Sequence, residues 1–360
     1  MTSIEDVRTL IERGYYEEAL EKIIELEEFL DKLDALRDLV SHIVQHKGPV
    51  EWIPDLIEDM EYISKRLKGH EDKAVGYGIT ASTLALAGYH SDAAEFFEKA
   101  LREAKKIKDP VGKGEVLANI AYELAVAGYP EESLGIFDTA FDSVINAETN
   151  YRIKVEGVLR IGELMEKAGD TLPSKNAIKF YSMAFDIFDK LHVNQRAALV
   201  EKKMKLATTV YDVGLPQIRK ALLEGRHHYT LALLEKIYDG TPLLIGALEI
   251  ALWMKRVNNP EYVDVVEYAF EKCRNPRFTK ANLQKIAKLL TDLGKLDMAL
   301  EFAKRIEEPM SRSEAIRGIV LELAGLERFT EAKKIAELIP DPRIREQTME
   351  EITAIEGGGR

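Results

Sequence analysis

The residues with the chemistry for metal binding are few and scattered. His42 and His46 are separated by one helical turn in "SHIVQH", a spacing that allows two imidazoles to chelate one metal ion. No glutamate stands between them, as the metalloprotease helix motif requires, and no third ligand is predictable nearby. We therefore interpret them as two surface histidines and predict no metal site, with chelation as the alternative.

The other reactive side chains also lack partners. Cys273 lies in the basic context "EKCRNPR", which lowers the pKa of a thiol, but no histidine partner is identifiable and we interpret it as a structural cysteine. His227 and His228 are adjacent, and we expect them in a solvated loop after Gly225. The segment "AVGYG" (74–78) lacks the spacing of a phosphate-binding loop. We predict no catalytic residues and no cofactor, and therefore no enzyme.

Composition places the chain among soluble globular proteins. Of its 360 residues, 46% are hydrophobic and 31% are charged. A single cysteine excludes an internal disulfide and favours a reducing compartment. No signal-peptide pattern is present, and the longest apolar run (241–254) contains Glu249 and is too short to cross a bilayer. We expect a cytoplasmic protein with no membrane contact, and the scarcity of glutamine beside abundant Glu, Lys and Arg favours a thermophilic source.

Charge is distributed unevenly along the chain. Residues 1–72 contain 19 acidic and 9 basic residues within a total net charge of −12. Two later stretches, 193–230 and 270–286, each carry a net charge of +4. A basic stretch can bind nucleic acid, but it more often forms the solvated face of a helix. Binding of nucleic acid is therefore a secondary hypothesis.

The elements that must position any site are helices. Apolar residues recur every three or four positions, and no segment alternates with the period of a strand. The stretch "LALAGYHSDAAEFFEKAL" (84–101) is followed forty residues later by the similar "LAVAGYPEESLGIFDTAF" (124–141). Predicted turns recur every 33 to 45 residues, a period typical of a helical solenoid. These turns are at Gly14, Gly48, Gly88, Gly128, Gly169, Gly214, Asn258, Gly294 and Glu327.

Each turn has the same residue types around it. A small side chain, such as Ala81 or Ala121, stands seven positions before most turns. Another, such as Ala93 or Ser133, stands five positions after several of them. Small residues allow two antiparallel helices to approach closely where they cross. A glycine ends the first helix in a left-handed conformation. Each copy is therefore predicted to be one helical hairpin, stable only when it stacks on its neighbours.

The three central copies resemble tetratricopeptide repeats. Residues 81–100 contain a small residue, glycine, small residue, aromatic residue and alanine in that family's order, and residues 121–140 and 162–184 repeat this order. The period is nearer 40 residues than the family's 34, and the clear resemblance covers about 110 residues. It implies a right-handed superhelix whose first helices line a concave groove that holds an extended or helical peptide.

The groove residues follow from the same resemblance. Some members of the family clamp a carboxylate with Lys, Asn and Arg; Asn119 and Arg160 match two of the five clamp positions, but Gly78, Ser82 and Glu156 occupy the others. Glu156 would repel a carboxylate, which argues against binding of a chaperone tail. The remaining candidates are polar residues of the first helices, which we expect to form one patch for a mixed-charge peptide. They are Ser82, Asn119, Tyr122, Arg160, Glu163, Lys205 and Thr208.

The sequence therefore predicts an all-α protein, a solenoid of about nine antiparallel hairpins. We divide it into an acidic N-terminal cap (1–72), core repeats (73–192), divergent repeats (193–340) and a C-terminal capping helix with a frayed tail (341–360). The main functional hypothesis is a non-enzymatic scaffold that binds a partner protein or peptide. The alternative is a nucleic-acid-associated or regulatory factor that uses the two basic stretches. The sequence does not indicate an oligomeric state.

Overall fold

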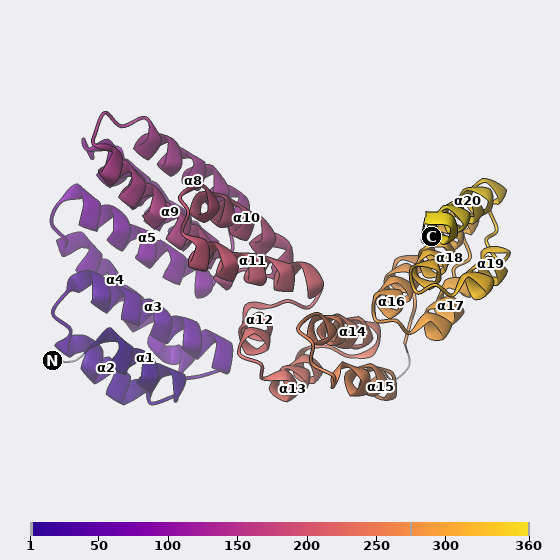
Figure 1. The fold of residues 1–360 in the computed structure, drawn as a ribbon. Coiled ribbons are helices and arrows are strands. Elements are labelled where there is room, and N and C mark those ends of the chain that lie inside the picture. The colour runs from indigo at the N-terminus through magenta and orange to yellow at the C-terminus, as the bar shows by residue number, and fades with distance from the viewer. Residues whose placement is uncertain (1–2, 274–275, 359–360) are drawn as a thin grey trace. The chain divides into compact units, whose positions relative to one another are not determined.

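The fold is all-α (Figure 1). The computed structural model describes residues 3–273 and 276–358, which contain twenty α-helices, one short 3-10 helix and no strand. The chain divides into two compact units, Met1–Met204 and Lys205–Arg360, and the boundary falls within helix α11. The finer division of the chain at residues 72, 192 and 340 stays a prediction.

The first unit is built from hairpins of successive helices. The pairs α5·α6, α7·α8 and α9·α10 pack tightly, and the first helices α3, α5, α7 and α9 also pack on one another. Its elements are α1 (Ile4–Glu12), α2 (Tyr16–Glu25), α3 (Phe29–His46), η1 (Val50–Trp52), α4 (Ile53–Arg66), α5 (His70–Leu86), α6 (His90–Ala104), α7 (Pro110–Val126), α8 (Pro130–Ile145), α9 (Tyr151–Thr171), α10 (Ser174–Lys190) and α11 (Asn194–Thr209).

The second unit repeats this arrangement with shorter helices. The pairs α14·α15, α16·α17 and α18·α19 pack as hairpins, and α14, α16, α18 and α20 pack in sequence. Its elements are α12 (Pro216–Leu223), α13 (His227–Ile237), α14 (Gly240–Arg256), α15 (Tyr262–Lys272), α16 (Lys280–Asp292), α17 (Leu296–Lys304), α18 (Pro309–Gly325), α19 (Phe329–Ala336) and α20 (Pro342–Gly358).

Most predicted turns are confirmed by their backbone conformation. Gly88 and Gly128 have φ of 91° and 84°, in the left-handed region that glycine adopts without a Cβ penalty. Asn258 and Glu327 adopt the same conformation, each with φ of 59°. At the turn predicted for Gly48, Lys47 is the left-handed residue that follows α3.

Two predicted turns are wrong in detail. Gly169 lies inside α9, where an added Cβ would come within 2.6 Å of the Tyr181 ring. The absence of a Cβ at Gly169 therefore permits close packing of α9 on α10, and this residue does not end the helix. Gly214 lies in the connection between α11 and α12, but the left-handed turn of this region is at Gly225, with φ of 73° between α12 and α13.

The predicted close crossings of hairpin helices are confirmed. Ala81 and Ala121 are completely buried. The Ser133 hydroxyl of α8 donates to the carbonyl oxygen of Ala121 on α7 at 2.6 Å, so the two backbones approach to within one small side chain. In the next hairpin, a Cβ at Gly162 would lie 3.0 Å from Ile187 of α10. Larger residues at these positions would separate the helices.

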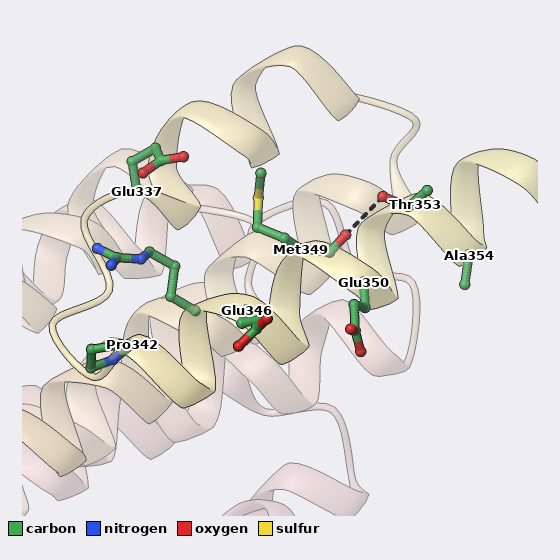
Figure 2. Close-up of a pocket in the computed structure, with 8 residues that line it drawn as sticks. Glu337, Pro342, Glu346, Met349, Glu350, Thr353 and Ala354 are labelled. Carbon is green, nitrogen blue, oxygen red and sulfur yellow. Dashed lines mark hydrogen bonds between the residues drawn. The ribbon is translucent and has the colours of Figure 1, made fainter.

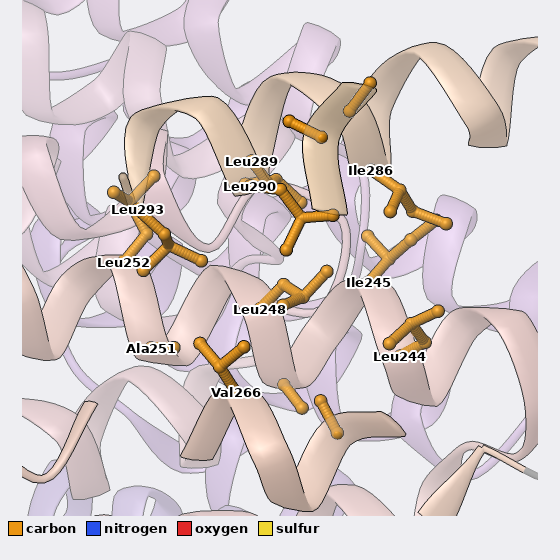
Figure 3. Close-up of a cluster of buried hydrophobic side chains, with 14 of the residues drawn as sticks. Leu244, Ile245, Leu248, Ala251, Leu252, Val266, Ile286, Leu289, Leu290 and Leu293 are labelled. Carbon is orange, nitrogen blue, oxygen red and sulfur yellow. The ribbon is translucent and has the colours of Figure 1, made fainter. Parts of the chain in front are cut away.

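The core of the second unit is centred on α14 (Figure 3). Apolar side chains on several faces of this helix, including Leu248 and Leu252, pack against Val266 of α15 and against Leu290 and Leu293 of α16. This position explains the long apolar run of the sequence at 241–254, because α14 is covered by neighbouring helices on both sides. No helix in the described part of the chain is long and apolar enough to cross a membrane.

The C-terminal helix is also confirmed. α20 begins with Pro342, a residue that suits the first turn of a helix because it lacks a backbone N–H. α20 packs on the preceding hairpin, which consists of α18 and α19, and its residues Thr348 and Ile352 are buried. The predicted frayed tail is partly replaced by helix, because α20 continues to Gly358, and residues 359–360 lie outside the described residues.

Candidate functional site

The predicted groove residues lie on first helices of the hairpins, but they differ in accessibility. Asn119 and Tyr122 on α7 are partly buried, and Arg160 on α9 is exposed while Glu163 is partly buried. Lys205 and Thr208 are exposed on α11, on the other side of the unit boundary.

Ser82 is a correction to this set. It is completely buried on α5, and its single O–H donates to the carboxylate of Glu123 on α7, with the carbonyl oxygen of Ile79 as a second acceptor within hydrogen-bond distance. Because it has no exposed surface, Ser82 cannot contact a partner at a groove. Its role is to hold a buried carboxylate between two helices.

The Glu123 carboxylate belongs to an ion pair that links α7 to α3, the first helices on either side of α5. Arg37 Nη1 on α3 lies 2.5 Å from Glu123 Oε1 on α7, and only 7% of Arg37 and 4% of Glu123 are exposed. Asp34 and Asp38 on α3 lie 3.1 and 3.2 Å from the same guanidinium. The residues of α5 beside the pair are small: a Cβ added at Gly78 would already contact Glu123 at 3.6 Å.

Burial decides the electrostatics of this cluster. It raises the pKa of Glu123 to about 7, although the Arg37 guanidinium and the Ser82 hydroxyl both oppose the shift. Burial likewise raises the pKa of Tyr122 to about 12, beside the Arg37 guanidinium at 5.9 Å from its ring centroid. Tyr122 therefore remains a neutral phenol, packed largely against its own protein.

A second cluster connects α7, α9 and α11. Arg160 Nη1 lies 3.0 Å from Glu115 Oε2 on α7, so its guanidinium is oriented across the gap between two first helices. Glu163 Oε1 lies 2.7 Å from Arg196 Nη1 on α11. Arg196 also binds Glu166, which is only 4% exposed, at 2.9 Å. Arg160 and Glu163 each therefore pair with a neighbouring helix.

A third cluster is buried in the second unit, and the sequence reasoning missed it. Glu249 of α14 is 1% exposed and lies 2.6 Å from Lys285 Nζ of α16. The backbone N–H of Asp212 donates to the same carboxylate at 3.2 Å. Burial raises the pKa of Glu249 to about 7 in spite of Lys285. A lone glutamate within an apolar run was the signal available in the sequence.

The two basic stretches are largely engaged within the protein. In the first, Arg196 and Lys203 bind the buried Glu166, and Arg219 is buried and donates to the carbonyl oxygen of Gly214. In the second, Lys272, Lys280 and Lys285 pair with Glu235, Glu308 and Glu249 at 3.4, 3.1 and 2.6 Å. Cations paired in this way have less charge to offer to phosphates.

The histidines and the cysteine form no reactive centre. His42 and His46 stack with ring centroids 3.9 Å apart, and His42 Nδ1 shares a hydrogen bond with the Tyr16 hydroxyl at 2.9 Å. Among the described residues, no group of three or more His, Cys, Asp or Glu could hold a metal ion. The Cys273 thiol lies 3.3 Å from the carbonyl oxygen of Gly240, and burial raises its pKa, the opposite of activation.

The predicted location of His227 and His228 is wrong. Both belong to the first turn of α13, because Gly225 ends α12 and the helix resumes directly after Arg226. The two side chains have different surroundings: His227 hydrogen-bonds with Asn259 at 3.3 Å, whereas His228 is exposed.

A large pocket at the C-terminal end is an open surface rather than a site. It has a volume of about 810 Å³ between the end of α19 and the outer face of α20 (Figure 2). Three glutamates, Glu337, Glu346 and Glu350, line it together with Arg345, and the Thr353 hydroxyl is already satisfied by the Met349 carbonyl oxygen at 2.9 Å. Exposed carboxylates alone do not define a ligand.

Comparison with known proteins identifies a close structural relative. The crystal structure of Ton1535 from Thermococcus onnurineus NA1 shares 58% sequence identity over 99% of this chain and 100% of that chain, with a TM-score of 0.90. The chain therefore belongs to the same protein family as Ton1535. A circular tandem repeat protein with novel repeat topology has 13% identity over 98% of this chain and 88% of its own. Its TM-score of 0.23 is too low to indicate a shared fold. No protein-family model and no curated protein matches the chain.

Proposed function

We propose that this protein is a non-enzymatic scaffold, a tetratricopeptide-like superhelix of about nine hairpins. In this proposal it binds a peptide or helix of a partner protein on a face formed by the first helices of the hairpins. The regular packing of α3, α5, α7 and α9 on one another supports a continuous face of this kind. We also propose a cytoplasmic location and, from the amino-acid composition, a thermophilic source.

The observation that carries the proposal is the setting of Arg160. Its side chain is 68% exposed, yet Glu115 of the neighbouring helix holds its guanidinium at 3.0 Å. A side chain held in one orientation loses less conformational entropy when a partner binds. Arginine is also among the residues that most often dominate the energy of protein interfaces. Arg160 is therefore suited to be a central contact.

The charges near Arg160 indicate the partner. Glu163 lies three residues later on the same helix, and Glu115 is the carboxylate already paired with Arg160. A partner with both acidic and basic side chains can exchange contacts with all of these groups, whereas a polyanion could pair only with the arginine among them. We infer a mixed-charge peptide or helix as the ligand.

The test compares two charge reversals on α9. Arg160→Glu removes the proposed contact, while Arg152→Glu changes an equally charged residue that is 86% exposed and, among the residues that the structure describes, pairs with Glu156 of its own helix. Each variant and the parent protein would be cross-linked in native lysate, and the captured proteins would be quantified by mass spectrometry. We expect the captured amount of a specific set of partner proteins to fall at least tenfold with Arg160→Glu and to stay unchanged with Arg152→Glu. Equal capture by all three proteins would contradict the proposal.

Association with nucleic acid remains the alternative proposal. The internal pairing of Lys203, Lys272 and Lys285 with carboxylates argues against it. A protein that binds phosphates releases counterions, so its affinity falls steeply as salt increases. Fluorescence polarisation with labelled single-stranded RNA and duplex DNA at 50 and 200 mM salt separates the two proposals.

A further inference from the structure

A second feature of the first unit has the shape of a small-molecule site. A cleft of about 470 Å³ lies between α8 and α10, above the first half of α9. Its walls are apolar side chains from all three helices: Phe141, Ile145, Val155, Val158, Met183 and Ile187. This volume and this lining match those of typical ligand sites, which measure roughly 300–1,000 Å³ and are mainly apolar with a few polar groups.

The cleft has a closed end and an open end. Phe137 of α8 and Phe180 of α10 meet edge to face, with centroids 6.1 Å apart, and join the two helices ahead of the cleft. Met165, which also lines the cleft, is only 1% exposed and lies towards this end of α9. At the other end, α8 stops at Ile145, and α9 begins at Tyr151, which is 77% exposed.

The closed end limits the kind of ligand that fits. A helix packs with its axis about 8–10 Å from the axis of each neighbour. No helix can lie between α8 and α10 where Phe137 and Phe180 already touch. The residues from Tyr151 to Met165 span roughly 20 Å along α9 at 1.5 Å per residue. The cleft therefore suits a narrow, extended apolar chain that enters from the open end.

Charged side chains stand at defined places on the rim. Lys154 is at the open end, because its ammonium group donates to the last carbonyl oxygen of α8, that of Ile145, at 2.8 Å. Lys190 is the last residue of α10 and lines the same end. Two exposed carboxylates, Asp138 and Asp186, lie further along the outer edges of α8 and α10. An anionic group is therefore favoured at the mouth and disfavoured along the edges.

We propose that this cleft binds a small amphiphile with an extended apolar chain and an anionic head group, of the class of long-chain carboxylates. The chain lies on Val155 and Val158 between α8 and α10, and the carboxylate is held at the mouth by Lys154 and Lys190. Tyr151 covers the junction between the apolar and charged parts. The proposal concerns the outer helices of two hairpins and does not depend on the scaffold function.

The experiment titrates the purified protein with three probes of equal chain length, all below their micellar concentrations. Isothermal titration calorimetry would measure the binding of sodium laurate, dodecanol and dodecyltrimethylammonium. We expect laurate to bind at one site per chain with an affinity about tenfold or more above that of the cationic probe. Dodecanol should fall between them, because it keeps the chain and lacks the charge. Equal affinity for laurate and the cationic probe, or no binding of laurate, would overturn the proposal.

Four variants locate the binding. Met183→Trp and Val155→Trp each fill the cleft from a different helix, and at least one is expected to remain folded by circular dichroism and to lose laurate binding. Lys190→Glu should weaken laurate about tenfold and strengthen the cationic probe. Lys175→Glu makes the same change near the start of α10, away from the cleft, and should alter neither affinity. Unchanged laurate binding in a folded Trp variant would place the amphiphile elsewhere and would overturn the proposal.

Discussion

Each unit contains a buried glutamate paired with a cation, and the two pairs differ in their contact with water. In the first unit the partner of Glu123 is Arg37, of which only 7% is exposed. In the second unit the partner of Glu249 is Lys285, whose side chain is 29% exposed and also binds the more exposed Asp212. Both side chains of the first pair are shielded from water, whereas in the second pair the Lys285 side chain remains partly exposed to water.

This difference teaches how charge is used in a repeat protein. Arg37 and Glu123 lie on α3 and α7 and meet beside the small residues of α5, so they connect three successive first helices. A buried pair adds little stability compared with apolar residues of the same shape, but loss of one partner leaves an unpaired buried charge. We infer that the Arg37–Glu123 pair specifies the alignment of these helices, while Lys285 mainly solvates a glutamate.

The largest effect is expected from Arg37→Met. The variant removes the cation shared by Asp34, Asp38 and Glu123, and Glu123, whose pKa is already about 7 beside Arg37, must take up a proton to stay buried at pH 8. We expect the free energy of unfolding to fall by about 3–5 kcal/mol. The double variant Arg37→Met/Glu123→Leu removes both charges and should recover most of the loss. Chemical denaturation followed by circular dichroism measures both. A loss below about 1 kcal/mol would mean that Glu123 is not buried as described.

The pH dependence of stability provides the second test. Glu123 has a pKa of about 7 in the folded protein, above the ordinary value of 4.5, so the folded state keeps a proton that the unfolded state has released between these pH values. Its contribution should therefore lower the free energy of unfolding as pH rises from about 4.5 to about 7, by up to about 3 kcal/mol, and should change little above pH 7. Comparison of the parent protein with Glu123→Gln isolates this contribution. If the free energies of unfolding of the two proteins change in parallel with pH, Glu123 does not make this contribution.

The smallest effect is expected from Lys285→Met. Glu249 keeps the backbone N–H of Asp212 as a donor at 3.2 Å, and its pKa of about 7 allows it to take up a proton when the cation is lost. We expect a loss of about 2 kcal/mol at pH 8, measured by the same denaturation experiment. A loss as large as that of Arg37→Met would show that exposure of the cation does not weaken the pair.

The hairpins were predictable from sequence because their signals are local. Gly88, Gly128 and the alanines at the crossings stand at fixed offsets within each copy, so one copy predicts the next. Gly169 was misread because a glycine serves either a left-handed turn or a close helix contact, and only the position of Tyr181 distinguishes them. Gly225 was expected to begin a loop but was not counted among the periodic turns, because the short helix α12 departs from the period.

The polar clusters were not predictable in the same way. Arg37 and Glu123 are 86 residues apart, and no spacing rule connects two charged residues across an intervening hairpin. Ser82 looked like a groove residue because its helix and its polarity were right, but its burial depends on Glu123 reaching back from α7. The cleft between α8 and α10 likewise depends on how far two outer helices separate, a distance that the apolar periodicity does not encode.

The most direct test of this comparison is a pair of double-mutant cycles at pH 8. One cycle combines Arg37→Met with Glu123→Leu, and the other combines Lys285→Met with Glu249→Leu, with unfolding free energies measured in the same denaturant. We expect a coupling energy of about 3 kcal/mol for the buried pair of the first unit and at most about half of that for the second. Equal coupling energies, or a larger value in the second unit, would contradict the account.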